Sequence, residues 1–138
     1  MRFAVLHHRA WPGKQDHYDL LIQFHEGTEN DRFLKAFASL ANAFPFPSPP
    51  GELRRESRLQ REEDHRIAYL TYEGPVGGGR GRVTRVDEGE CKVLRPPTRE
   101  ELLCRLTGVR LRGTYRVRHL GQDWVIEEVM ETNASEGR

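Results

Sequence analysis

The sequence has no large excess of charge of either sign. Its 138 residues include 22 lysines and arginines and 21 aspartates and glutamates, so the formal net charge is only +1. Proteins that bind nucleic acids or acidic membranes through bulk charge carry many more basic than acidic residues. Any basic surface on this protein must therefore be local, built by the placement of side chains rather than by their number.

Cysteines and long apolar runs are also scarce. The two cysteines, Cys91 and Cys104, lack the CxxC spacing of a zinc knuckle, and one pair is too few for a disulfide scaffold. We expect free thiols in a reducing compartment. The first residues, MRFAVLHH, hold no apolar run long enough for a signal peptide or a transmembrane helix. These features favour a cytoplasmic protein that does not associate with membranes.

The chain has no internal repeats, and its length suits one domain. Hydrophobic residues make up 36% of the chain and charged residues 31%, so the composition is polar for a globular protein. A chain of this length can still bury a hydrophobic core. We expect a single domain over residues 1–130 and a flexible polar tail over residues 131–138.

Short β-type runs separated by turns fill most of the sequence. We expect strands or strand-like runs at 2–6, 17–24, 66–74, 82–86, 91–95, 109–120 and 124–130, loops at 9–16 and 45–51, and a turn at 87–90. The pattern predicts a mainly β fold, a small antiparallel β-barrel or sandwich with one or two short helices.

Two segments leave helix and strand open, and a third predicts helical turns. Residues 27–44 fit either a helix capped near Asp31 or a strand around 33–38. Residues 52–65 fit an edge strand or a helix. Residues 95–108 contain the capping-box pattern from Thr98 to Glu101, which is typical of one or two helical turns.

Three of the six histidines lie in the thirteen residues HHRAWPGKQDHYD, 7–19. If the strands on either side form a hairpin, His8 ends one strand close to where His17 and Asp19 begin the next. Residues 17 and 19 share a face because side chains alternate along a strand. Two imidazoles and a carboxylate suit manganese, zinc or iron, and His65 is a further candidate. The alternative is a polar loop that binds nothing.

Glycines and arginines offer two weaker signals for phosphate binding. The run GPVGGGRGRV, residues 74–83, lacks the P-loop pattern and precedes a strand, which favours a tight, bulged turn, although Arg80 and Arg82 beside it could contact phosphates. Further arginines recur at 54, 55, 58 and 61 and at 110, 112, 116 and 118. The second set could share one strand face that tracks a nucleic-acid backbone, or form a solvated face balanced by acids. Trp11 is either a core anchor or a stacking platform.

Five motifs, in order across residues 2–127, resemble one known family. They are RFAVLHH, DHYDLLIQF, EDHRIAYLTYEG, a glycine-rich turn leading into VTRVDEG, and a closing LRGTYRVRHLGQDW. The ordered set is similar to the 3'-phosphoesterase domain of bacterial DNA ligase D, and its spacing is closer to a compact stand-alone branch of that family than to the ligase-fused domains.

The resemblance implies a small β-barrel with the active site in a crater. It implies manganese, or another divalent metal such as zinc or cobalt, and removal of a 3'-terminal ribonucleoside and then of the 3'-phosphate from DNA or RNA ends. By the same resemblance His8, Asp19 and His65 are metal ligands, and His17 and Tyr69 act at the phosphate. Arg58, Arg80 and Arg82 are candidates for binding the substrate. The implied protein is a monomer that works in DNA repair.

The sequence also departs from the family. Leu21 stands where the family has an arginine that clamps a phosphate oxygen, and Leu6 replaces a glutamine. The loop between His8 and His17 is longer than in the ligase-fused domains, and the chain begins almost at its first strand, without the segment that supplies further polar residues there. Two alternatives to an enzyme therefore stay open, a non-catalytic barrel that binds nucleic-acid ends and a module that keeps only the fold.

The remaining histidines are assigned by strand alternation and by the motifs. Only one of His7 and His8 can face the site, because neighbouring side chains on a strand point to opposite faces. His8 is preferred, since it matches the family histidine. His25 and His119 have no motif around them and are expected at the surface.

Overall fold

The computed structural model describes residues 1–39 and 56–129. The expected proline-rich loop at 45–51, the tail at 131–138 and the arginines at 54 and 55 lie outside the described residues. No helix in the described part of the chain is long and apolar enough to cross a membrane.

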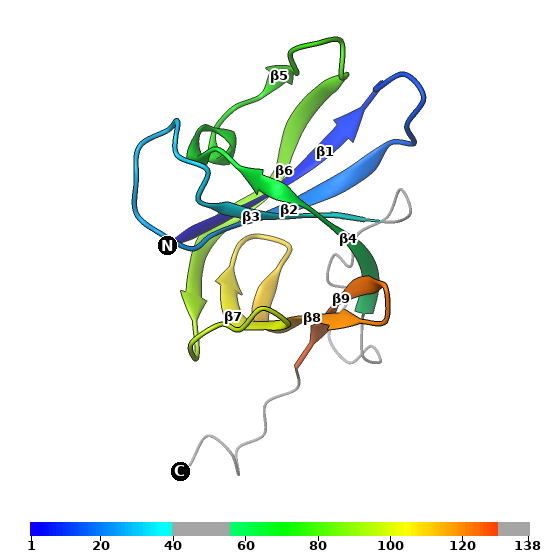
Figure 1. Cartoon of the computed structure of the whole chain (residues 1–138). Helices are drawn as coiled ribbons and strands as arrows, with labels where there is room; N and C mark the ends of the chain where they lie inside the picture. Colours follow the sequence, from blue (N-terminus) through cyan, green and yellow to red (C-terminus); the bar gives the residue numbers. More distant parts are fainter. Residues whose placement is uncertain (40–55, 130–138) are drawn as a thin grey trace, which may run out of the picture.

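The described residues form a closed antiparallel β-barrel (Figure 1). Its elements are β1 (Arg2–Arg9), β2 (His17–Gln23), β3 (Leu34–Ser39), β4 (Glu56–His65), η1 (Ile67–Leu70), β5 (Gly74–Pro75), β6 (Arg82–Val93), β7 (Glu101–Thr107), β8 (Arg112–Leu120) and β9 (Asp123–Glu128). Eight strands pair in the order β1-β2-β3-β4-β9-β8-β7-β6, and pairing of β6 with β1 closes the ring, while the short β5 adds to β6. The predicted mainly β fold, as a small antiparallel barrel, is confirmed.

Three local predictions were wrong. Residues 66–74 are not a strand, since they hold the 3-10 helix η1 and a turn. Residues 87–90 are not a turn, because β6 runs unbroken from Arg82 to Val93. Residues 95–108 hold strand β7 rather than helical turns. Of the two segments left open, the described part of 27–44 contains strand β3 and the described part of 52–65 is strand β4. β4 is not an edge strand, because it pairs with both β3 and β9.

The capping pattern at Thr98 is present without a helix behind it. The Thr98 hydroxyl accepts hydrogen bonds from the backbone N–H groups of Glu100 at 3.2 Å and Glu101 at 3.0 Å. This local turn fits the entry to a helix or to a strand equally well. The alternation that follows in β7, with Leu102, Cys104 and Leu106 buried, selects the strand.

Asp87 explains why β6 continues through the polar DEGE segment. Its side chain is buried, and its two carboxylate oxygens accept hydrogen bonds from the backbone N–H groups of Val109, Arg110 and Leu111 at 2.7–3.0 Å. The carboxylate thus accepts the hydrogen bonds of the backbone N–H groups in the turn between β7 and β8. Opposite Val5 and Leu6 of β1 the register shifts, which marks a bulge in β6 at this point.

Two apolar clusters occupy opposite faces of the β1–β2 hairpin. Phe3 of β1 and Leu20 of β2 belong to the larger cluster, which fills the barrel. Leu6 and Leu21 belong to a smaller cluster, which η1 covers with Ile67, Tyr69 and Leu70 packed against it. Because Leu20 and Leu21 are neighbours on one strand, the two clusters lie on opposite faces. His8, His17 and Asp19 share the face of the smaller cluster.

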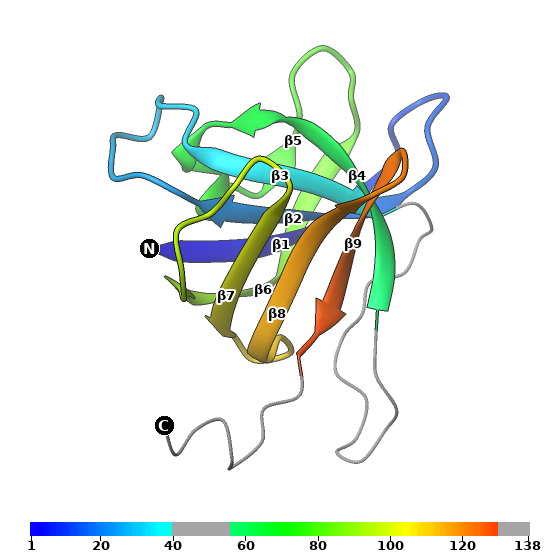
Figure 2. The same ribbon diagram turned by 60° about the horizontal axis from the view of Figure 1, so that its bottom comes forward.

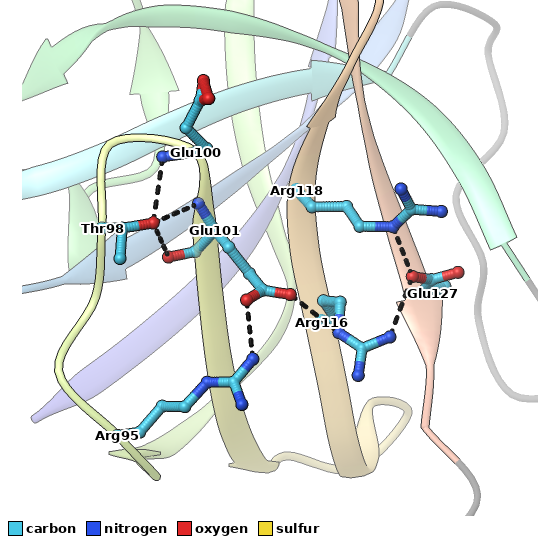
Figure 3. A network of polar contacts seen from close by, with 7 residues as sticks. All are labelled: Arg95, Thr98, Glu100, Glu101, Arg116, Arg118 and Glu127. Carbon is cyan, nitrogen blue, oxygen red and sulfur yellow. Dashed lines mark hydrogen bonds and ion pairs between the residues drawn. The ribbon is translucent and has the colours of Figure 1, made fainter.

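Two arginines of β8, Arg116 and Arg118, form ion pairs with acidic residues. Figure 3 shows a chain of ion pairs across β7, β8 and β9. Arg116 Nε lies 2.9 Å from a carboxylate oxygen of Glu101, and Arg118 Nε lies 2.7 Å from a carboxylate oxygen of Glu127. Arg116 also contacts Glu127 at 3.4 Å, and Arg95 contacts Glu101 at 2.6 Å. This network favours the face balanced by acids over the phosphate-tracking face.

We expect that Asp87→Ala will lower the free energy of unfolding by about 2–4 kcal/mol, because it leaves three N–H groups of the β7–β8 turn, among them the buried one of Leu111, without an acceptor. Chemical denaturation measures the loss. Glu90→Ala, an exposed acid on the same strand, is the matched control and should change stability by less than about 0.5 kcal/mol. Equal effects of the two variants would contradict the role assigned to Asp87.

Glu127 should make stability depend on pH. The hydrogen bond from Arg118 lowers the pKa of Glu127 below its ordinary value of 4.5, against the opposing effect of burial. A lowered pKa in the folded state gives stability that is present above the ordinary value and is lost as the pH falls through the folded value. The difference in unfolding free energy between the native protein and Glu127→Gln should therefore be constant near neutral pH and shrink below about pH 4.5. Glu90→Gln should show no such change, and a Glu127→Gln difference that persists unchanged at low pH would argue against the ion pair.

Candidate metal centre

The pairing of β1 with β2 brings His8, His17 and Asp19 together. His8 lies directly opposite His17 in the register, and Asp19 lies opposite Leu6, two residues further along β2. All three side chains are buried, and each offers one metal-ligating atom within 4.8 Å of the others. The hairpin expected from the sequence thus places these three residues around one point.

In each imidazole, the nitrogen that points away from Asp19, called the outer nitrogen here, is hydrogen-bonded to a backbone carbonyl. His8 Nε2 lies 2.6 Å from the carbonyl oxygen of Arg80, and His17 Nδ1 lies 2.9 Å from that of Gln15. A carbonyl can only accept, so each of these nitrogens carries the proton. The lone pairs are left on His8 Nδ1 and His17 Nε2, and these are the atoms that face Asp19. Metal-ligating histidines in proteins have their outer nitrogen held in the same way.

The inner atoms of the three residues face one another closely. His8 Nδ1 lies 3.4 Å from one carboxylate oxygen of Asp19, and His17 Nε2 lies 3.2 Å from the other. Neutral imidazole nitrogens and carboxylate oxygens are all electron-pair donors, so this arrangement is favourable only with a proton or a cation between them. The donor set therefore fits a divalent cation, with coordination positions left open for other ligands.

The pKa shifts of His17 and Asp19 agree with this geometry. Burial lowers the pKa of His17, but the hydrogen bond and the negative charge of Asp19 outweigh it, and the pKa is raised above its ordinary value. Burial likewise raises the pKa of Asp19, and hydrogen bonds from His17 and His8 reverse this effect, so that the pKa is lowered. A cation must displace the proton held here, so its affinity will fall as the pH drops through the raised pKa of His17.

The glycine-rich segment positions the carbonyl that holds His8. Gly81 has φ +76°, and a side chain there would collide with the backbone of Arg9 and Trp11. The absence of a side chain lets the turn before β6 pack against the end of β1, which brings the Arg80 carbonyl to His8. The segment is a tight turn between β5 and β6, as favoured from the sequence. Figure 1 shows this turn and the β1–β2 connection at the same end of the molecule.

His65 and Tyr69 lie nearby but outside the group of three. His65 is half-buried, its Nδ1 lies 2.8 Å from the Glu63 carbonyl, and its ring meets that of Tyr69 edge-on with centroids 5.7 Å apart. Both line the same cavity as the three buried residues. The geometry therefore groups His17, rather than His65, with His8 and Asp19. The family resemblance had assigned the third ligand to His65 and the phosphate contact to His17.

The cavity has a volume of about 400 Å³ and a charged lining. Its cationic residues are Lys14, Arg32, Arg66 and Arg80, and its acidic residues are Asp19, Glu62 and Glu63. The guanidinium of Arg66 lies 5.7 Å from the ring centroid of Tyr69. Cations gathered at the wall of one cavity attract anions to it.

Only one of the three arginines predicted to bind substrate lines this cavity. Arg80 does, with its Nε donating to the Gly77 carbonyl at 2.7 Å. Arg82 is exposed and is not part of the lining, and Arg58 on β4 pairs with Asp123 at 2.8 Å.

Several lining residues carried no signal that the sequence analysis used. Lys14 and Arg32 lie in loops, and Arg66 directly follows His65, where position alone does not indicate a cavity. Glu62 lies opposite Ala36, which in turn lies opposite Leu21, so its side chain is on the site's face of the sheet. One Glu62 carboxylate oxygen is buried and has no hydrogen-bond partner. Strand alternation from His65 could have found Glu62 only with the bulge in β4 known.

The histidine and tryptophan alternatives are resolved by packing. His7 stacks on Tyr18 at 4.3 Å between ring centroids, on the face opposite His8. His25 and His119 are exposed, as expected. Trp11 is half-buried, lines the cavity, and stacks on His8 with ring centroids 5.1 Å apart. It belongs to the site rather than to the barrel core.

A scan against models of known protein families and a search of curated proteins both give no match to this chain.

We expect His17→Ala to weaken binding of Mn²⁺ or Co²⁺ by more than about 100-fold, because it removes a ligand, whereas His65→Ala should change it by less than about threefold. Isothermal titration calorimetry at neutral pH measures both. His25→Ala, an exposed histidine, is the matched control. The reverse order, with His65 essential and His17 dispensable, would restore the ligand set implied by the family resemblance and contradict the one drawn from the structure.

Proposed function

We propose that this protein is a divalent-metal-dependent phosphoesterase that trims the 3' ends of DNA or RNA. The observation that carries the proposal is the convergence of two imidazole nitrogens and a buried carboxylate on a cavity lined by four cationic side chains. The five ordered motifs support it from the side of the sequence. Manganese is the metal we favour, with zinc and cobalt as alternatives.

The lining residues supply the groups that phosphate-ester hydrolysis needs. When bound by His8, His17 and Asp19, a divalent cation supplies a Lewis acid that neutralises charge on the phosphate. Arg66 and Arg80 line the same cavity, and their guanidinium groups can bind phosphate oxygens.

His65 and Tyr69 supply proton donors beside the phosphate subsite. His65 has its Nδ1 held by a carbonyl, so in its protonated form Nε2 can donate a proton to the leaving oxygen. The Tyr69 hydroxyl can hydrogen-bond the charge that develops on the phosphate.

The proposed reaction proceeds in two hydrolytic steps. Water attacks the phosphodiester, the bond from phosphorus to the oxygen of the terminal ribonucleoside breaks, and that oxygen takes up a proton. Water then attacks the remaining 3'-phosphate and releases inorganic phosphate, leaving a 3'-hydroxyl. A 3'-hydroxyl end is the form that DNA repair proteins can extend or join. We propose that the protein acts on such ends as a cytoplasmic monomer.

A second function, the binding of nucleic-acid ends without turnover, is favoured by Leu21. This residue stands where the family has its phosphate-clamping arginine, and it is fully buried in the smaller apolar cluster. A leucine cannot bind phosphate, so the clamp must come from another residue or be missing. Arg66 is the strongest replacement, because it lines the cavity beside Tyr69 and has no ion pair with a described residue.

The decisive assay follows Mn²⁺-dependent product formation on primer-templates that end in a 3'-phosphate or in one 3'-ribonucleotide. We expect both ends to be converted to 3'-hydroxyls, with loss of activity in EDTA and in Asp19→Asn. Arg66→Gln should lower kcat/KM by about tenfold or more, since it removes a charged phosphate contact. Arg58→Gln, an exposed arginine outside the cavity, should leave kcat/KM unchanged.

The outcomes separate the two functions. Salt-sensitive binding of the ends without product under any metal would favour the end-binding function. A folded protein that neither binds metal nor distinguishes a 3'-phosphate from a 3'-hydroxyl would overturn both.

A further inference from the structure

The two cysteines lie side by side on the inner face of the barrel. Cys91 on β6 and Cys104 on β7 are both buried free thiols and belong to the larger apolar cluster. Cys104 lies directly opposite Val93 in the strand register, so it is the diagonal neighbour of Cys91 on the same face. The two thiols share a hydrogen bond. They form a pair of sulfur ligands that the candidate metal centre does not use.

The spacing of this pair favours a bridging ion over a disulfide. Diagonal neighbours on paired strands have Cα atoms about 7–8 Å apart. A disulfide requires the two Cα atoms to be closer than about 7 Å, unless the backbone moves. A metal ion allows a wider spacing, because two metal–sulfur bonds of about 2.3 Å each can separate the sulfur atoms by about 4.6 Å.

A cavity of about 400 Å³ gives access to the pair. It is lined by the end of β2, the end of β6 and the start of β7, next to the amino terminus labelled in Figure 1 and Figure 2. Cys91 is among its lining residues. The cavity is remote from the candidate metal centre, since His8 and Arg2 stand at opposite ends of β1, about 20 Å apart at the usual rise of a strand.

The surroundings of the pair select an ion that needs few ligands. Much of the cavity wall is apolar, with Ile22, Val93 and Leu102 among the lining residues, and no histidine, aspartate or glutamate is among the described residues that line it. Zinc in proteins takes four ligands, which two thiolates cannot supply. Cu(I) prefers thiolate and thioether sulfur and is stable with two or three such ligands. Met1 also lines the cavity and carries a thioether.

We propose that Cys91 and Cys104 form a second metal site that binds one Cu(I) ion. The ion enters through the cavity, and both sulfurs bind it as thiolates, so each thiol releases its proton to water. The thioether of Met1 is available as a third ligand. The proposal does not depend on the phosphoesterase function, because the two cavities share no lining residue.

Competition for Cu(I) between the reduced full chain and the chelator bicinchoninate tests the proposal. We expect the protein to take one Cu(I) per chain from the chelator. Cys91→Ala and Cys104→Ala should each lower the affinity by more than about 100-fold, because even changes in groups that only orient a ligand cost about 10- to 100-fold. Val93→Ala removes apolar volume from the same cavity without removing sulfur, and it should keep the affinity within about threefold.

X-ray absorption at the copper edge identifies the ligands, and circular dichroism checks that each variant is folded. We expect sulfur alone around the copper. His17→Ala, which alters the other cavity, should leave the Cu(I) affinity unchanged. Failure of the folded protein to take up Cu(I), nitrogen ligands on the bound copper, or an affinity that is unchanged in Cys91→Ala would each overturn the proposal.

Discussion

The register between β1 and β2 is the constraint on which the candidate site depends. His8 faces His17 across the pair, and Asp19 follows on the same face, only because the two strands pair with this offset. A slip by one residue would send His7 to the site and His8 into the barrel. The apolar clusters prevent this slip, since Phe3 and Leu20 must fill the barrel while Leu6 and Leu21 pack under η1. The core therefore fixes the positions of the atoms that could ligate a metal.

The same arrangement brings electron-pair donors close together, and a bound cation would relieve the electrostatic repulsion between them. Two imidazole lone pairs and a carboxylate face one another in a buried place, and backbone carbonyls of Arg80 and Gln15 prevent either ring from changing its tautomer easily. The turn with Gly81 has no role in the barrel core, yet it brings one of those carbonyls into place. These features are consistent with a centre shaped for a bound ion.

Local patterns were enough to predict the part of the site that lies in one hairpin. His8, His17 and Asp19 are close in sequence, and strand alternation relates them directly. The residues that complete the cavity come from distant segments, so no spacing rule connects Arg32 or Arg66 to His8. Local composition also predicts a turn at 87–90, where acidic residues and a glycine are typical of one. In the structure Asp87 instead accepts hydrogen bonds from backbone N–H groups of a turn more than twenty residues away. Local propensity cannot predict an interaction between segments so far apart in the sequence.

The availability of the arginines also depends on contacts between distant parts of the sequence. The alternating arginines at 110, 112, 116 and 118 suggest a phosphate-binding face, but Glu101 and Glu127, from the neighbouring strands, pair with Arg116 and Arg118 (Figure 3). Arg66 and Arg80, which form no ion pair with a described residue, line the cavity of the candidate metal centre instead. Pairing across strands, rather than position along one strand, decides which cations remain available to a ligand.

A crystal structure of the protein soaked with Mn²⁺, with anomalous differences measured near the manganese edge, tests the central claim most directly. The account predicts one strong peak within about 2.4 Å of His8 Nδ1, His17 Nε2 and a carboxylate oxygen of Asp19. A peak bound by His65 in place of His17, or no peak in this cavity at saturating manganese, would contradict it.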